Sequence, residues 1–177
     1  MMTWEELMAY NRNRRICQIG FDTTEDKLEE TLTNWVEKAG VGPWKVFRKR
    51  YKNTNNGMII ALAMFGNTEV EVVALTGDWA KKNEEKLKQH GSCFSHFKEY
   101  CPSEARAKKE KDFKSWGVEV LPRMVYPINE KWPDEAWFVR TEEYISFRLE
   151  LGNFAFLSEE TLTQEDTDWY WFPAIRK

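Results

Sequence analysis

Four potential metal ligands lie close together in the middle of the sequence, because both histidines and two of the three cysteines fall there. They are His90, Cys93, His96 and Cys101. Nitrogen and sulfur ligands in this number are what tetrahedral zinc takes in proteins. Cys93 and His96, at positions i and i+3, could chelate a metal from one face of a helix. A zinc site is therefore one hypothesis for this segment.

A structural role is the alternative for the same four residues. The spacing contains no Cys-x-x-Cys pair, and a chain of this size folds without the help of a metal. In that interpretation Cys93 and Cys101 pack in the core as small hydrophobic residues, His90 stabilises the end of a helix, and His96 is exposed. We therefore expect no obligate cofactor and retain zinc as the alternative.

Cys93 and His96 also suggest a nucleophile activated by a neighbouring base, with Tyr100 nearby on the same predicted helix. A helix interior offers no donors to an oxyanion, since its amides are already hydrogen-bonded. The sequence contains none of the common glycine-rich phosphate loops or catalytic signatures. An enzyme that depends on zinc or on a cysteine is accordingly the third hypothesis for the function.

A basic segment with interleaved aromatic residues covers residues 45–52 and has the length of a strand. Its candidate nucleic-acid contacts are Arg48, Lys49, Arg50, Tyr51 and Lys52. These side chains could place phosphate contacts beside a stacking ring, although the acidic pI of about 5.6 is unlike that of a dedicated binder. The structural alternative is an edge strand whose charges prevent unwanted pairing. A small RNA- or DNA-binding module is the second hypothesis.

The carboxyl-terminal third is acidic and rich in tryptophan. Its candidate partner-binding residues are Trp132, Asp134, Asp166, Asp168, Trp169 and Trp171. Aromatic anchors combined with negative charge favour binding to a protein with a basic surface. Trp137 lies inside a predicted strand and is expected in the core. The leading hypothesis is a non-enzymatic, inhibitor-type protein, of the kind that phage or mobile elements encode against nucleic-acid-processing enzymes.

The segment around which the chain is organised is an apolar hairpin. Residues 58–65 are apolar at consecutive positions, after the turn-forming Asn55-Asn56-Gly57 and before Gly66-Asn67. This pattern predicts a strand that is covered on both faces, followed by a tight turn and a second strand to Leu75. A second Gly-Asn dipeptide at 152 and 153 lacks matching flanks, so we interpret it as shared turn chemistry rather than as an internal repeat.

The remaining elements predict an α+β fold. Thr3 and Glu6 form a capping-box pattern before a short helix, and Leu28 and Leu32 begin the apolar stripe of a longer one. Further helices are predicted over residues 78–90, 92–101 and 103–116, and further strands over residues 16–21, 118–126, 136–140, 145–151 and 154–157. Residues 168–173 are predicted as a last strand or an extended tail. This order indicates a largely antiparallel sheet with helices packed on one side.

The length of 177 residues predicts a single domain over residues 1–177. The first residues are acidic where a signal peptide is basic, and no apolar run reaches the length of a membrane span. An odd number of cysteines without a disulfide spacing is typical of a reducing compartment. We therefore expect a cytoplasmic protein with no membrane contact.

Overall fold

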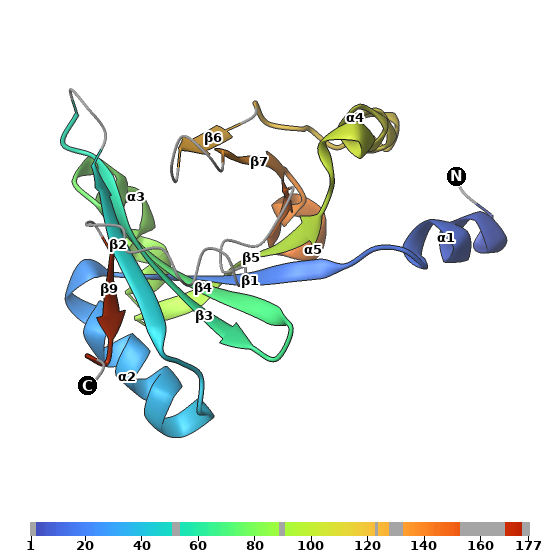
Figure 1. The fold of residues 1–177 in the computed structure, drawn as a ribbon. Coiled ribbons are helices and arrows are strands. Elements are labelled where there is room, and N and C mark those ends of the chain that lie inside the picture. Colours follow the sequence, from blue (N-terminus) through green and yellow to red (C-terminus); the bar gives the residue numbers. More distant parts are fainter. Residues whose placement is uncertain are drawn as a thin grey trace. The chain divides into compact units, whose positions relative to one another are not determined.

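The computed structural model describes residues 3–50, 54–88, 91–122, 124–127, 133–152 and 169–174 (Figure 1). The chain divides into two compact units. The first unit comprises Met1–Cys17 and Phe97–Ala155, and the second comprises Gln18–His96 and Phe156–Lys177. Strands β1 (Ile16–Thr23) and β5 (Ser92–Tyr100) run from one unit into the other. The single domain expected from the length remains a prediction.

The second unit is built on an apolar hairpin and one long helix. Its elements are η1 (Glu25–Lys27), α2 (Leu28–Ala39), β2 (Trp44–Arg50), β3 (Gly57–Phe65), β4 (Thr68–Thr76), α3 (Asp78–Leu87) and β9 (Trp169–Phe172). Its strands follow the order β5-β1-β4-β3-β2-β9. β1 is parallel to β4, while β2, β3, β4 and β9 pair in antiparallel fashion.

The predicted hairpin is confirmed. β3 and β4 pair from Gly57 and Thr76 to Phe65 and Thr68, which leaves Gly66 and Asn67 as the two-residue loop. Gly66 has a φ of 62°, a conformation that glycine adopts without steric cost. Residues from Gly57 to Ala63 are all buried, so both faces of β3 are covered, as the consecutive apolar run predicts.

Helix α2 covers one face of this hairpin. Leu28 and Leu32 are buried and pack in one cluster with residues of alternating position on the strands: Val46, Ile59, Ala61, Ala63, Val70, Val72 and Ala74. The helix ends at Gly40, which adopts the left-handed conformation. The opposite side chains of β4, at odd positions, are therefore directed away from α2.

Strand β2 does not lie at an edge, and that prediction is wrong. Val46 pairs with Ala61 of β3 on one side and with Tyr170 of β9 on the other. A strand or an extended tail at residues 168–173 was expected from the sequence, but its partner was not. The charged residues of β2 did not show that it lies inside the sheet, because the strand that covers its outer side, β9, comes from the far end of the chain.

The first unit contains α1 (Trp4–Asn11), η2 (Ser103–Ala105), α4 (Arg106–Ser115), β6 (Met124–Pro127), β7 (Pro133–Val139), α5 (Glu142–Ile145) and β8 (Arg148–Gly152). The strand order is β6-β7-β8-β5, with β6, β7 and β8 antiparallel. Trp137 is completely buried in a cluster with Phe113 and Leu151, which confirms its expected place in the core. The capping box of Thr3 and Glu6 is also confirmed.

Three predicted elements differ from the structure. Residues 92–101 form strand β5 instead of a helix, since pairing with neighbouring strands overrides the apolar spacing of three and four. The strand predicted over residues 145–151 is divided into α5 and β8, and that over residues 118–126 retains only β6 and a bridge from Val120 to Val139. The strand predicted over residues 154–157 lies outside the described residues.

The order of the strands and the main helix is β-α-β-β-β in two segments, first β1-α2-β2-β3-β4 and then β5-α4-β6-β7-β8, with the short helix α5 between β7 and β8 of the second. The predicted class, an α+β fold with a largely antiparallel sheet and helices packed on one side, is confirmed. The two Gly-Asn dipeptides do not mark this repetition, because Gly66 lies between the third and fourth strands of the first segment and Gly152 ends the fourth strand of the second.

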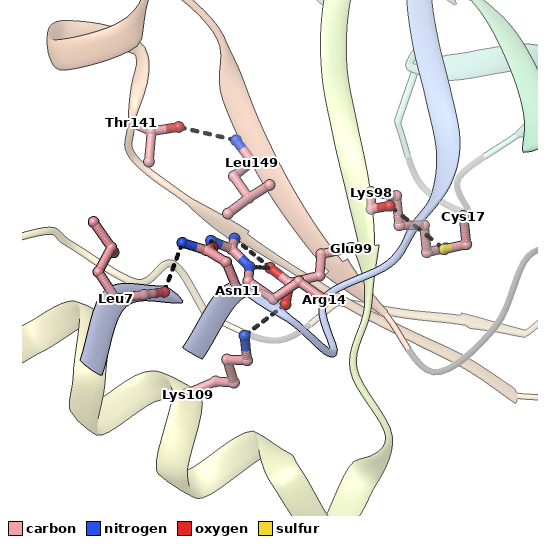
Figure 2. Close-up of polar contacts among 9 residues, drawn as sticks. All are labelled: Leu7, Asn11, Arg14, Cys17, Lys98, Glu99, Lys109, Thr141 and Leu149. Carbon is pink, nitrogen blue, oxygen red and sulfur yellow. Dashed lines mark hydrogen bonds and ion pairs between the residues drawn. The ribbon is translucent and has the colours of Figure 1, made fainter. Parts of the chain in front are cut away.

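A buried carboxylate joins three elements of the first unit (Figure 2). Glu99 of β5 is only 1% exposed, and its Oε2 accepts hydrogen bonds from Nε and Nη2 of Arg14, at 2.9 and 2.5 Å. Its Oε1 accepts a hydrogen bond from Nζ of Lys109 on α4, at 2.5 Å. These contacts hold α4 and the segment after α1 against β5, because removing either cation would leave a buried charge less well paired.

We predict that Glu99→Gln lowers the free energy of unfolding by about 2–4 kcal/mol, because a neutral amide cannot balance two cations at a buried position. The matched control is Glu30→Gln, since Glu30 pairs with Lys27 at the exposed surface. That control is expected to cost at most about 1 kcal/mol. Urea denaturation of both variants measures the difference, and equal losses would contradict the role given to Glu99.

Candidate functional site

The predicted zinc site assumed that Cys93 and His96 lie on a helix, but both lie on strand β5. Because Cys93 and His96 lie on a strand, three residues apart, their Cα atoms are separated by about 10 Å, too far for chelation from one helical face. His90 lies outside the described residues, and Cys101 belongs to the first unit. Among the described residues, no group of three or more histidine, cysteine, aspartate or glutamate side chains is placed to hold a metal.

The structure also weakens the hypothesis that a cysteine acts as a nucleophile. Burial raises the pKa of the Cys101 thiol to about 11, so this residue is protonated and unreactive near neutral pH. Cys17 is likewise buried, and its thiol donates to the backbone oxygen of Lys98 at 3.5 Å (Figure 2). Cys93 is half-buried. Its activation by His96 was proposed on a helix that does not form.

The acidic aromatic residues are only partly described. Trp132, Asp166 and Asp168 lie outside the described residues. Asp134 is part of β7, and Trp169 and Trp171 are part of β9. The half-buried Trp171 pairs with Lys45 of β2. Partner binding by these residues stays a prediction.

The basic segment is described as far as Arg50. Lys49 and Arg50 end strand β2, while Tyr51 and Lys52 lie outside the described residues. Nη2 of Arg48 forms an ion pair with Oε1 of Glu25 at 2.6 Å. Arg48 is thus already neutralised by a carboxylate, and nucleic-acid binding through this strand stays a prediction.

The second unit contains a buried polar cluster that could not be recognised in the sequence. Gln18 of β1, Glu69 and Glu71 of β4, and His96 of β5 are all buried, with exposures between 0% and 6%. The parallel register sets Gln18 opposite Glu69 and Gly20 opposite Glu71. Both glutamates are at odd positions of β4 and are therefore directed away from helix α2.

The Gln18 amide is oriented by its two neighbours. Its Nε2 donates to Oε1 of Glu69 at 2.5 Å, and its Oε1 lies 3.2 Å from Nε2 of His96. The reverse orientation would place the amide oxygen against the carboxylate, where neither atom can donate. Glu69 thereby holds the carbonyl oxygen of Gln18 toward the imidazole.

The imidazole of His96 faces oxygen atoms on both edges. Its Nε2 lies 3.4 Å from Oε2 of Glu71 as well as 3.2 Å from Oε1 of Gln18. Its Nδ1 lies 3.3 Å from the Ser95 hydroxyl. Because Nε2 faces two acceptors, we assign the proton of the neutral ring to Nε2, which lets the Ser95 hydroxyl donate to Nδ1. A hydroxyl can also accept, so Ser95 suits the other tautomer equally well.

Gly20 has no side chain, and this leaves room for the imidazole of His96. A Cβ atom on Gly20 would lie 2.1 Å from Cε1, 2.4 Å from Nδ1 and 2.6 Å from Nε2 of His96. These distances are far below van der Waals contact, so the ring rests directly on the backbone of β1 at Gly20. A residue with a side chain at this position would displace His96 from the cluster.

The first unit holds a different pair on the corresponding strands of the second β-α-β-β-β segment. Nζ of Lys98 on β5 lies 3.3 Å from Oε1 of Glu150 on β8, and the two side chains are 0% and 5% exposed. A buried carboxylate requires a compensating charge, and an ammonium group of the chain supplies it here.

Solved structures match the chain at low sequence identity, whereas no protein-family model and no curated protein matches it. A hypothetical protein from Bacillus halodurans C-125 is 13% identical over 80% of this chain and 94% of its own, with a TM-score of 0.59. The methylmalonyl-CoA epimerase from Mycobacterium tuberculosis is 12% identical over 79% of this chain and 87% of its own, with a TM-score of 0.56. A mutant 4-hydroxymandelate synthase from Streptomyces coelicolor is 10% identical over 80% of this chain and 50% of its own, with a TM-score of 0.58.

These neighbours have vicinal-oxygen-chelate folds, of the glyoxalase- and bleomycin-resistance-like type, and this chain is similar to them in fold. Two of the three named neighbours are enzymes, which overturns the prediction of a non-enzymatic protein-binding inhibitor from a phage or mobile element. That prediction relied on surface composition, which carries no information about what the sheet encloses. In the described part of the chain, no helix has the length and apolar character needed to cross a bilayer.

We predict that Gly20→Ala lowers the free energy of unfolding by about 1–3 kcal/mol, because the new methyl group overlaps the His96 ring. Removing the ring should relieve the overlap. The double variant Gly20→Ala/His96→Ala is therefore expected to be no less stable than His96→Ala alone. Denaturant unfolding of the three variants measures the coupling, and an additive loss would contradict the contact.

We predict that one thiol of the folded protein reacts rapidly with a thiol reagent near pH 8, and that it is Cys93. Cys17 and Cys101 are each 1% exposed, and the raised pKa of Cys101 further suppresses its thiolate. Cys93→Ser should abolish the rapid phase, whereas denaturant should expose the buried thiols. Rapid labelling in the Cys93→Ser variant would show that the buried thiols are accessible.

Proposed function

We propose that this protein is a metal-dependent enzyme acting on a small molecule, and that Gln18, Glu71 and His96 hold its divalent cation. One observation supports this most directly: the amide oxygen of Gln18 and a carboxylate oxygen of Glu71 converge on Nε2 of His96, at 3.2 and 3.4 Å. Ligand atoms about 2.1 Å from one cation lie about 3.0–3.4 Å from one another. The distances from His96 Nε2 to the other two atoms therefore match those between adjacent corners of a coordination shell.

The donor set fits a first-row divalent cation. One imidazole nitrogen, one carboxylate oxygen and one amide oxygen are ligands that manganese, iron, cobalt, nickel and zinc accept. Glu69 is not required as a ligand, because it keeps the Gln18 oxygen turned toward His96. Ser95 would accept the proton of Nδ1 once Nε2 is used as a ligand. A bound cation would supply Lewis-acid polarisation of a substrate oxygen.

The reaction class we propose is proton transfer at a carbon beside a carbonyl group. One structural neighbour is named as a methylmalonyl-CoA epimerase in complex with methylmalonyl-CoA and NH4+, and it is 14% identical over 80% of this chain and 94% of its own, with a TM-score of 0.57. In the cluster described above, Glu69 is not assigned to the cation, so it is the carboxylate able to accept a proton from carbon. Its burial favours this role, because water competes less for the carboxylate there.

Metal binding is the first test. Titration calorimetry and the visible absorption of bound cobalt should show one cation per wild-type chain, with affinity at least about 100-fold weaker in His96→Ala and Glu71→Gln. Ser95→Ala should weaken binding by about tenfold, through the loss of support at Nδ1. Cys93→Ser, on the same strand, is the matched control and should bind as wild type does.

Two results would contradict the proposed site. Wild-type binding retained in His96→Ala would place the cation elsewhere, and loss of binding in Cys93→Ser would restore the cysteine to the ligand set. The reaction class has its own readout. The metal-loaded protein should exchange the hydrogen beside the thioester carbonyl of methylmalonyl-CoA with deuterium from solvent, as followed by NMR, and Glu69→Gln should stop the exchange.

A further inference from the structure

Helix α1 of the first unit presents a solvent-exposed apolar stripe. Trp4 is 72% exposed, Leu7 43% and Met8 53%, and every residue of the helix except the half-buried Tyr10 is exposed. The three apolar residues stand at positions i, i+3 and i+4, so they share one face. Such a stripe is typical of a helix that packs against a partner.

The side of α1 that carries Tyr10 packs against other residues of the first unit. The Tyr10 ring contacts the Trp116 ring at 5.6 Å between centroids and lies 4.5 Å from Nζ of Lys109 on α4. Arg14, just beyond the helix, is bound to Glu99 as described above (Figure 2). These contacts fix the rotation of α1, so that Trp4 and Met8 remain directed to solvent.

The apolar stripe of α1 is flanked by a negative charge near the start of the helix and a positive charge just after its end. Glu5 and Arg12 are both exposed, and at i and i+7 they lie along the same edge of the stripe. They are about 10 Å apart along the helix axis, too far to pair with each other. Neither forms an ion pair that is recorded within the described residues.

We propose that α1 is a self-association surface on which two copies of this chain pack through antiparallel α1 helices. In an antiparallel pair related by a twofold axis, the same edges of the two helices face each other. Glu5 of each copy then lies opposite Arg12 of the other, and the two apolar stripes of Trp4, Leu7 and Met8 cover each other. A parallel pair would not bring these opposite charges together.

The proposed contact between two α1 helices is small, so the dimer is expected to be weak. Three apolar side chains on a helix of 8 residues cannot bury the ~800 Å² per partner of a standard interface. We therefore expect a weak dimer that forms reversibly, with a dissociation constant in the high-micromolar range. The association is independent of the metal site proposed above, since no residue of α1 belongs to the second unit.

A charge-exchange series measured by sedimentation equilibrium tests the proposal with the full-length chain. Glu5→Arg and Arg12→Glu should each raise the dissociation constant by about tenfold, because each removes two symmetric pairs and adds repulsion. Combining the two substitutions recreates the pairs with reversed signs and should restore the affinity to within about threefold of wild type. Trp4→Ala should abolish the dimer.

Matched controls separate association from folding. Glu29→Arg, an exposed change on α2, should leave the dissociation constant unchanged. Trp4→Ala should keep the wild-type melting temperature when measured at a dilution where the wild type is monomeric, because Trp4 is mostly exposed in the single chain. A wild type that stays monomeric over the measured concentrations, or a double variant as weak as the single ones, would overturn the proposal in favour of a different partner for α1.

Discussion

The burial of polar side chains between β1, β4 and β5 is the constraint on which the second unit depends. A buried amide, imidazole or carboxylate is costly unless other polar atoms satisfy it. Gln18, Glu69, Glu71 and His96 meet part of this requirement through one another. Their mutual satisfaction needs the parallel register of β1 and β4 and a glycine beneath the imidazole, so a shift of one residue along either strand would break the set.

The rest of the second unit maintains that register. Two parallel neighbours in a sheet need a long connection, and here it consists of α2, β2 and β3. Alternation along β4 then separates two environments, since Val70 and Val72 pack under α2 while Glu69 and Glu71 are directed away from it. The apolar cluster thus positions the polar one without contributing any of its chemistry.

Local features of the fold could be predicted from the sequence because their causes are local. The two-residue turn at Gly66 and Asn67, the capping box of Thr3 and Glu6, and the apolar stripe of α2 all follow from residues close together in the chain. The secondary structure of residues 92–101 and the polar cluster depend instead on pairing between distant strands. Alternating Glu69 and Glu71 resemble a solvated strand face, and a single glutamine has no motif that would set it apart.

The short cluster of histidines and cysteines drew attention to His96 on the premise of a helix that does not form. His96 is in the candidate site, but its neighbours there are Gln18 and Glu71, which are far from it in sequence. The register of β1 with β4 is the information that connects them. A search for mixed polar residues at alternating positions of predicted strands would have included Gln18 and both glutamates.

The Lys98 and Glu150 pair gives the second β-α-β-β-β segment a charge compensation that does not depend on supply from solution. A lysine ammonium is encoded in the gene and is present at fixed stoichiometry. The cation proposed for Gln18, Glu71 and His96 would instead have an occupancy that varies with its concentration and with competing chelators. Under the proposed function, starvation for trace elements would therefore alter the charge balance of the second unit and leave the Lys98 and Glu150 pair unchanged.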